Sequence, residues 1–134
     1  MTDSIQIDAE FQHIPYIEKI LHTFVSVAKP ERIILFGSYA RGDFKPKSDV
    51  DFMILIKGLK NKSDMYDEIE LSLDNCIRIP IDYLLMDFEG FYELKDTAGY
   101  VYKNIYQEGK VVYGSLQHSS WQITPFKYQG SYEK

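Results

Sequence analysis

The spacing of apolar residues along the chain predicts short helices and strands in alternation. From Ile14 to Val25 apolar side chains recur every three or four positions, the period of a helix with one buried face, and Pro30 ends this helix. Two continuous apolar runs follow, at residues 32–37 and 49–56, and each is short enough to be a buried strand. A short helix or turn and a polar loop connect them.

The second half of the chain continues this alternation, with Ser63 as the expected N-cap of a helix and Gly109 as an expected C-cap. The order of elements predicts an α+β fold, an α/β sandwich in which a small mixed β-sheet carries helices mainly on one face. The later elements are expected to be a helix over residues 62–79, a strand over 79–87, helical segments over 88–109 with a break near Asp96–Thr97 or Gly99, and a strand over 110–114.

Composition and charge narrow the class of protein. A chain of 134 residues with 45% hydrophobic and 26% charged residues is typical of one globular domain. The formal net charge of −5 provides no field to attract long nucleic acid. No apolar run reaches membrane-spanning length and residues 1–10 do not resemble a signal peptide, so the expected location is the cytoplasm. The single cysteine, Cys76, is expected to be a small buried hydrophobe.

Two aspartates open the second apolar run. Side chains alternate across a strand, so Asp49 and Asp51 point to one face while Val50 and Phe52 point to the core. Carboxylates this close repel each other, and a proton or a divalent cation must relieve the conflict. Mg²⁺ prefers hard oxygen ligands of this kind. Because Asp-x-Asp also occurs at solvated strand ends, the pair alone leaves both interpretations open.

Asp82 adds a third carboxylate inside an otherwise apolar run. A carboxylate in such a strand is costly unless it is paired or binds a metal. If the third strand lies beside the second, the three carboxylates could hold two metal ions about 3.5–4 Å apart, as in phosphoryl transfer. Asp82 could also take the proton of an incoming hydroxyl. Asp43 in the loop and Asp87 after the strand are poorer candidates.

The Gly37–Ser38 pair ends the first strand and opens the short helix or turn that follows. Glycine permits close backbone approach, and a helix N-terminus presents N–H groups to a phosphate. Arg41, with Lys45 or Lys47, would add positive charge. A phosphate site followed by metal ligands on the next strand is what a nucleotide–Mg²⁺ complex requires.

The stretch GSYARGDFKPKSDVDFMI resembles the signature of the nucleotidyltransferase superfamily with the DNA polymerase beta-type fold. The form with GSxARG and SDxDxxI is similar to the minimal nucleotidyltransferases. This resemblance implies a catalytic and metal-binding set of Asp49, Asp51 and Asp82, with a two-ion Mg²⁺ site. It also implies a nucleotide-binding set of Gly37, Ser38, Arg41 and Ser48. Lys47 departs from the acidic or neutral residue that relatives often carry.

The same resemblance implies a reaction and a partner. The expected reaction transfers AMP from ATP to a hydroxyl and releases pyrophosphate. Many minimal nucleotidyltransferases are similar to antitoxins that add AMP to a tyrosine of a HEPN-domain toxin, so such a toxin is the expected acceptor. Two alternatives stay open: transfer to a small molecule of the aminoglycoside type, and an antitoxin that acts by contact alone. The oligomeric state, a homodimer or a hetero-oligomer, is open as well.

The resemblance ends before the last part of the chain. Residues 1–114 are expected to form the nucleotidyltransferase domain, and residues 115–134 an aromatic tail. The aromatic side chains of the tail would contact a partner or a second copy, or fold back on the domain; they are Trp121, Phe126 and Tyr128.

Overall fold

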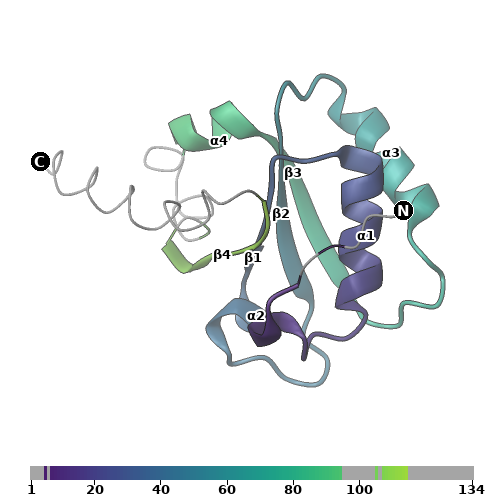
Figure 1. Cartoon of the computed structure of the whole chain (residues 1–134), viewed down its shortest axis with the longest axis vertical. Coiled ribbons are helices and arrows are strands. Elements are labelled where there is room, and N and C mark those ends of the chain that lie inside the picture. The colour runs from purple at the N-terminus through teal and green to yellow at the C-terminus, as the bar shows by residue number, and fades with distance from the viewer. Residues whose placement is uncertain (1–4, 6, 95–104, 106, 115–134) are drawn as a thin grey trace, which may run out of the picture.

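The computed structural model describes residues 5, 7–94, 105 and 107–114 (Figure 1). The elements follow the order that the apolar pattern predicts. Their bounds are a 3₁₀ turn η1 (Ala9–Phe11), α1 (Ile17–Ala28), β1 (Arg32–Phe36), α2 (Ser38–Arg41), β2 (Val50–Ile56), α3 (Lys62–Ser72), β3 (Ile81–Asp87), α4 (Phe88–Leu94) and β4 (Lys110–Tyr113).

The strands form one mixed sheet in the order β3-β2-β1-β4. β1 runs antiparallel to both β2 and β4, while β2 and β3 are parallel. Parallel neighbours need a crossover connection, and α3 supplies it between β2 and β3. The predicted α+β fold with a small mixed sheet is therefore confirmed.

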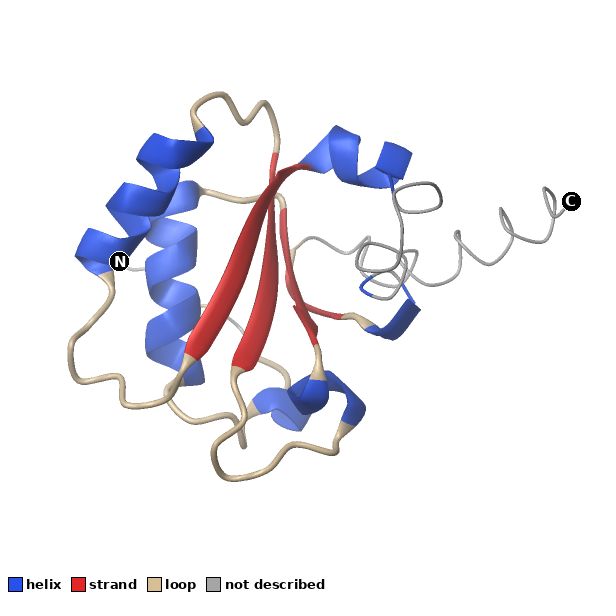
Figure 2. Cartoon of the chain, turned by 180° about the vertical axis from the view of Figure 1, so that it is seen from behind, coloured by secondary structure: helices blue, strands red, loops and turns tan. Residues whose placement is uncertain are grey.

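One face of the sheet is covered by α1 and α3, which lie side by side against it (Figures 1 and 2). The side chains of this core come from both helices and from alternate positions of the strands. Phe24 of α1 packs edge-on against Phe52 of β2, with ring centroids 5.4 Å apart, and tilts against Tyr83 of β3 at 5.2 Å. The buried set includes Ile17, Ile20, Leu21, Ile33, Leu35, Ile54, Ile69 and Leu85.

α4 lies on the opposite side of the sheet from α1 and α3 (Figure 2), and a second, smaller core surrounds it. Met53 and Leu55 of β2 are fully buried there, together with Phe91 of α4 and Ile105. Asp51 lies two residues before Met53, so its side chain is on this same face, at the end of the sheet away from α4. Apolar side chains of the sheet are thus covered on both faces, and the end of the second face that lies away from α4 carries the polar side chain of Asp51.

Three local predictions were wrong. The helix expected over residues 62–79 ends at Ser72. The N-cap of α3 is Asn61, whose side chain accepts the Asp64 N–H at 3.0 Å, and not Ser63. Cys76 is exposed, because α3 ends at Ser72 and the Asp74 carboxylate turns the chain by accepting the Cys76 N–H at 2.8 Å. The expected break near Asp96–Thr97 or Gly99 and the tail over residues 115–134 lie outside the described residues.

Within the described ranges, no helix is long and apolar enough to cross a membrane.

Candidate functional site

The parallel pairing of β2 with β3 brings the three predicted aspartates together. Asp82 lies directly opposite Asp51 in the register of the two strands, so both side chains leave the sheet on the same face. Asp49 stands two residues before Asp51 and joins them. One carboxylate oxygen from each residue lies within 4.8 Å of the other two. The sequence predicted all three residues, Asp82 on the condition that its strand lies beside the second, and the strand order meets that condition.

These carboxylates are in electrostatic conflict. The pKa of Asp51 is raised to about 6, first because the side chain is half-buried and then because the Asp82 and Asp49 carboxylates lie nearby. The guanidinium of Arg41 lowers this pKa and only partly offsets the rise. Hard oxygen donors at this spacing fit a divalent cation such as Mg²⁺, which would relieve the repulsion. The donor set therefore suits the metal that the sequence predicts.

A glycine is required at position 37, because its backbone lies against the acidic cluster. Its backbone angles, φ 77° and ψ −158°, belong to a region that residues with a Cβ rarely adopt. A Cβ at this position would overlap the Asp51 carboxylate oxygen Oδ2. The neighbouring Phe36 pairs with Asp51 across β1 and β2, which fixes the approach. The absence of a side chain thus lets α2 begin directly beside the acidic cluster.

Ser38 and Arg41 are the first and last residues of α2. The Arg41 N–H donates to the Gly37 carbonyl at 3.0 Å, which keeps both ends of this one-turn helix close to Asp51. The Arg41 side chain donates from Nε to Asp43 and from Nη1 to Glu108, each at 3.3 Å. Sequence reasoning missed Glu108, which is 67 residues away along the chain.

Ser48 closes the loop between α2 and β2. Its Oγ accepts the Lys45 N–H at 2.8 Å and its own N–H donates to the Lys45 carbonyl at 2.9 Å. The ring of Phe44 stacks on Tyr39 with centroids 4.2 Å apart and contacts His13 at 5.6 Å. These aromatic contacts, which the sequence reading did not foresee, hold the loop against α2. The two hydrogen bonds of Ser48 to the Lys45 backbone hold the loop that carries Lys45 and Lys47.

The two acidic residues considered poorer candidates lie apart from the cluster. Asp87 caps α4 at the opposite end of β3, where it accepts the Gly90 N–H at 3.0 Å and the Leu59 N–H at 3.3 Å. These backbone hydrogen bonds hold the pKa of Asp87 below its ordinary value. Asp43 pairs with Arg41. Both therefore have structural partners of their own.

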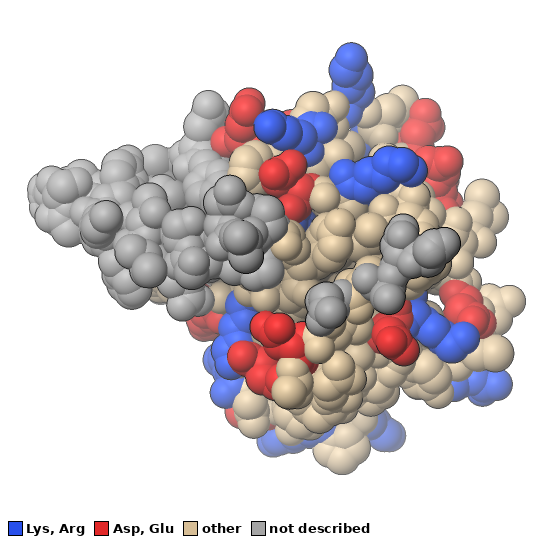
Figure 3. Space-filling view, viewed as in Figure 1, with Lys and Arg blue, Asp and Glu red and all other residues tan. Residues whose placement is uncertain are grey.

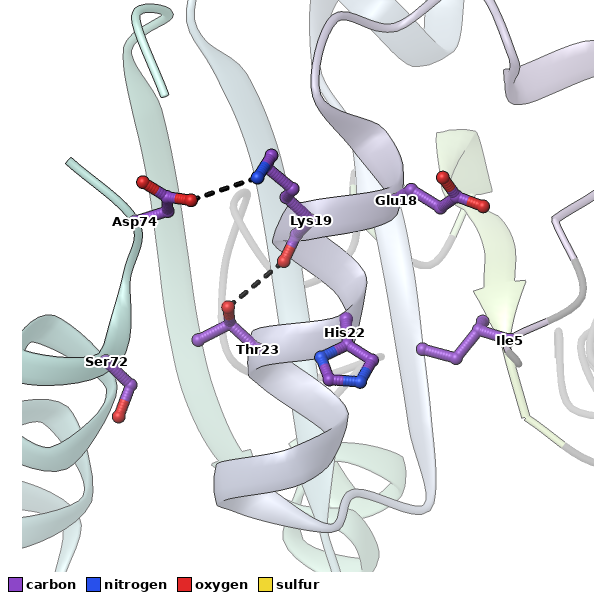
Figure 4. Close-up of a pocket in the computed structure, with 7 residues that line it drawn as sticks. All are labelled: Ile5, Glu18, Lys19, His22, Thr23, Ser72 and Asp74. Carbon is purple, nitrogen blue, oxygen red and sulfur yellow. Dashed lines mark hydrogen bonds and ion pairs between the residues drawn. The ribbon is translucent and has the colours of Figure 1, made fainter. Parts of the chain in front are cut away.

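A hollow of about 440 Å³ lies elsewhere, beside α1 (Figure 4). Figure 4 shows Lys19 reaching from α1 to Asp74, with an Nζ–Oδ2 distance of 3.0 Å, and the His22 ring facing the same space. None of the seven residues that line it belongs to the acidic cluster. Figure 3 shows acidic and basic side chains interspersed over the face in view, without one continuous basic stripe. We therefore place the chemistry at the three aspartates.

Comparison with known proteins agrees with this placement. The family described as "Polymerase beta, Nucleotidyltransferase" matches residues 18–118, which include the Gly-Ser turn and all three aspartates. The chain belongs to the polymerase beta nucleotidyltransferase family. The resemblance that the sequence motif carries is thereby confirmed, and the domain is a nucleotidyltransferase.

Two relatives of this nucleotidyltransferase come from Methanocaldococcus jannaschii. A candidate protein adenylyltransferase of that organism is 29% identical over 107 residues, which are 72% of this chain and 97% of the relative. A second candidate protein adenylyltransferase is 46% identical over 44 residues, 33% of this chain and 44% of that relative. Similarity to the first extends over nearly the whole relative, and similarity to the second over a shorter segment.

Two crystal structures share the fold of this nucleotidyltransferase. A toxin–antitoxin complex with AMP-PNP contains a chain that aligns with a TM-score of 0.52 at 21% identity, over 84% of this chain and 86% of that one. A variant of the toxin–antitoxin complex MntA–HpeT aligns with a TM-score of 0.51 at 19% identity, over 84% and 86% of the two chains. At this identity the likeness is one of fold.

Gly37→Ala and Gly42→Ala form a matched pair that tests the contact between Gly37 and the cluster. Both glycines have positive φ, 77° and 92°, but a Cβ at Gly42 would meet nothing within 4 Å. Each variant is expected to lose about 1–2 kcal/mol of unfolding free energy from backbone strain. Only Gly37→Ala should also lose the rise in melting temperature that Mg²⁺ produces, because it displaces Asp51. Equal Mg²⁺ responses in the two variants would contradict this account.

Asp51→Asn tests the electrostatic conflict in metal-free protein. The pKa of the Asp51 carboxyl is raised to about 6 in the folded chain, whereas it is about 3.9 in the unfolded chain. The free energy of unfolding therefore falls as the pH rises from about 3.9 through 6. The shift corresponds to about 3 kcal/mol at most, and solvent screening of this half-exposed group reduces it to about 1 kcal/mol.

In urea unfolding with a chelator, Asp51→Asn is therefore expected to be about 1 kcal/mol more stable than the unmodified chain at about pH 8. At about pH 4 the two proteins should be equally stable, because the Asp51 carboxyl is then protonated when folded. A difference in stability that does not change with pH would contradict the claim that the charged Asp51 carboxylate destabilises the fold.

Proposed function

We propose that this nucleotidyltransferase transfers AMP from ATP to a hydroxyl of a partner protein, a tyrosine of a HEPN-type toxin, and so acts as its antitoxin. The observation that carries the proposal is the cluster of Asp49, Asp51 and Asp82, whose carboxylate oxygens lie within 4.8 Å of one another. Mg²⁺ held by these residues would carry the triphosphate and neutralise charge at the α-phosphate.

The residues around the cluster suit the binding of a triphosphate. Gly37 brings the start of α2 against Asp51, and the first residues of a helix leave backbone N–H groups without intrahelical partners. The Ser38 hydroxyl and the Arg41 guanidinium, one turn apart, add donors beside them. In the proposal these groups orient the β- and γ-phosphates, so that the α-phosphate lies over the carboxylates.

Asp82 is the member of the cluster to which we assign the role of base toward the acceptor hydroxyl. Its side chain, like that of Asp49, is exposed, whereas Asp51 is half-buried, so a hydroxyl from another molecule can approach it from solvent. Asp82 accepts the proton of that hydroxyl as its oxygen bonds to the α-phosphorus. The bond from the α-phosphorus to the bridging oxygen breaks, and pyrophosphate leaves.

The choice of a protein acceptor rests on the relatives. The M. jannaschii relatives are candidate protein adenylyltransferases, and the chains that share the fold come from toxin–antitoxin complexes, one of them with AMP-PNP. The HEPN type of the partner and its tyrosine follow from the resemblance to minimal nucleotidyltransferases.

Intact mass spectrometry of the native complex tests the proposed function. The protein is isolated with whatever it binds, incubated with ATP and Mg²⁺, and every chain is weighed. We expect the partner to gain whole AMP units on a tyrosine. Asp49→Asn should abolish this gain because it removes a carboxylate of the cluster. Asp67→Asn, which removes an exposed carboxylate on α3, is the matched control and should retain it.

Other outcomes would favour the other functions. A partner that stays bound without gaining mass, with ATP and with other nucleoside triphosphates, would contradict transfer and favour an antitoxin that acts by contact. Pyrophosphate release that depends on an added small molecule, without any partner protein, would favour a small-molecule acceptor.

A further inference from the structure

Arg41 lies between two carboxylates at the edge of the acidic cluster. Its Nε donates to Asp43 Oδ2 and its Nη1 to Glu108 Oε1, each at 3.3 Å. In the described part of the chain, its other terminal nitrogen, Nη2, has no hydrogen-bond partner. Two sides of the guanidinium are thus engaged, and donors remain for a ligand.

Asp43 and Glu108 differ in how firmly the chain holds them. Asp43 lies in the exposed loop after α2, two residues from Arg41. Glu108 lies 67 residues away and immediately precedes the buried Gly109. A Cβ on Gly109 would come within 2.5 Å of both the Ile105 carbonyl oxygen and Ile34 Cγ2.

The backbone at Gly109, next to Glu108, therefore lies in close contact with Ile34 of β1. The Gly109 N–H also donates to the Ile105 carbonyl at 2.8 Å. On the other side of Gly109, Lys110 begins β4 and pairs with Glu10 at 3.3 Å. Glu108 therefore reaches Arg41 from a backbone that the buried Gly109 and β4 hold on its C-terminal side, and its carboxylate is the better anchor of the two.

We propose that Glu108 is a positioning residue for nucleotide binding: it holds the Arg41 guanidinium beside the acidic cluster, so that Arg41 meets the triphosphate already oriented. This inference rests on the proposed function, because it takes a nucleoside triphosphate to be the ligand. Arginine has a long side chain that loses rotamer freedom when it binds, and an anchor that restrains it beforehand lowers that cost.

A second effect of Glu108 opposes the first. Its negative charge lies close to the place where a triphosphate would bind, and like charges repel. Both partners of the ion pair are partly exposed, with side-chain exposures of 46% for Arg41 and 37% for Glu108, so screening weakens this repulsion. The direct contact at 3.3 Å to the guanidinium carries the larger effect, and removal of Glu108 weakens nucleotide binding.

Calorimetric titration of the 134-residue chain with AMP-PNP and Mg²⁺ tests the inference. Arg41→Ala is expected to weaken binding about tenfold, the loss of charge-assisted hydrogen bonds. Glu108→Ala should weaken it about three- to fivefold, as expected for one exposed ion pair. Glu108→Gln, which keeps an acceptor oxygen, should lose less. In the Arg41→Ala background, Glu108→Ala should change the dissociation constant no further.

The double variant separates positioning from a structural role. Equal losses from Glu108→Ala in both backgrounds would mean that Glu108 supports the fold and not Arg41, and would overturn the inference. Tighter binding by Glu108→Ala would overturn it too, since repulsion would then dominate. An unmodified chain that binds no AMP-PNP would overturn the proposed function itself, whereas unmodified binding with unaffected Glu108 variants would overturn this inference alone.

Discussion

The repulsion among three carboxylates on neighbouring strands is the constraint on which the rest of this structure depends. Parallel pairing sets Asp82 directly opposite Asp51, with Asp49 two residues earlier on the same face. The strands cannot separate these charges, because Phe52 and Tyr83, the next residues along, are buried in the core of α1 and α3. The fold thus holds an unfavourable charge cluster in place, and a bound cation would turn it into a favourable one.

The residues of α2 and the glycine before it lie beside this cluster. Gly37 allows α2 to start against Asp51, and Arg41 at the end of that turn supplies the nearby positive charge. The core on the α4 face leaves this end of the sheet uncovered, since α4 begins at the far end of β3. The site is therefore a product of strand register together with one glycine whose position no other residue could take without displacing Asp51.

Much of this arrangement could be predicted from the sequence, because its signals are local. The two-residue period places Asp49 and Asp51 on one face, and the apolar runs predict all four strands. The position of Asp82 followed only on the condition that its strand lies beside β2, which the structure provides. Glu108 carries no local signal: an exposed glutamate is ordinary, and its meeting with Arg41 depends on how β4 pairs with β1. The choice of Asn61 over Ser63 likewise depends on backbone geometry, since both residues make good caps.

The most direct test of this site is a crystal structure of the chain with Mn²⁺ in place of Mg²⁺ and with AMP-PNP. An anomalous scattering peak is expected in contact with the carboxylates of Asp49, Asp51 and Asp82, with the nucleotide phosphates beside Gly37 and Ser38. A nucleotide bound elsewhere, for example in the hollow beside α1, with no metal at the three carboxylates, would contradict this expectation.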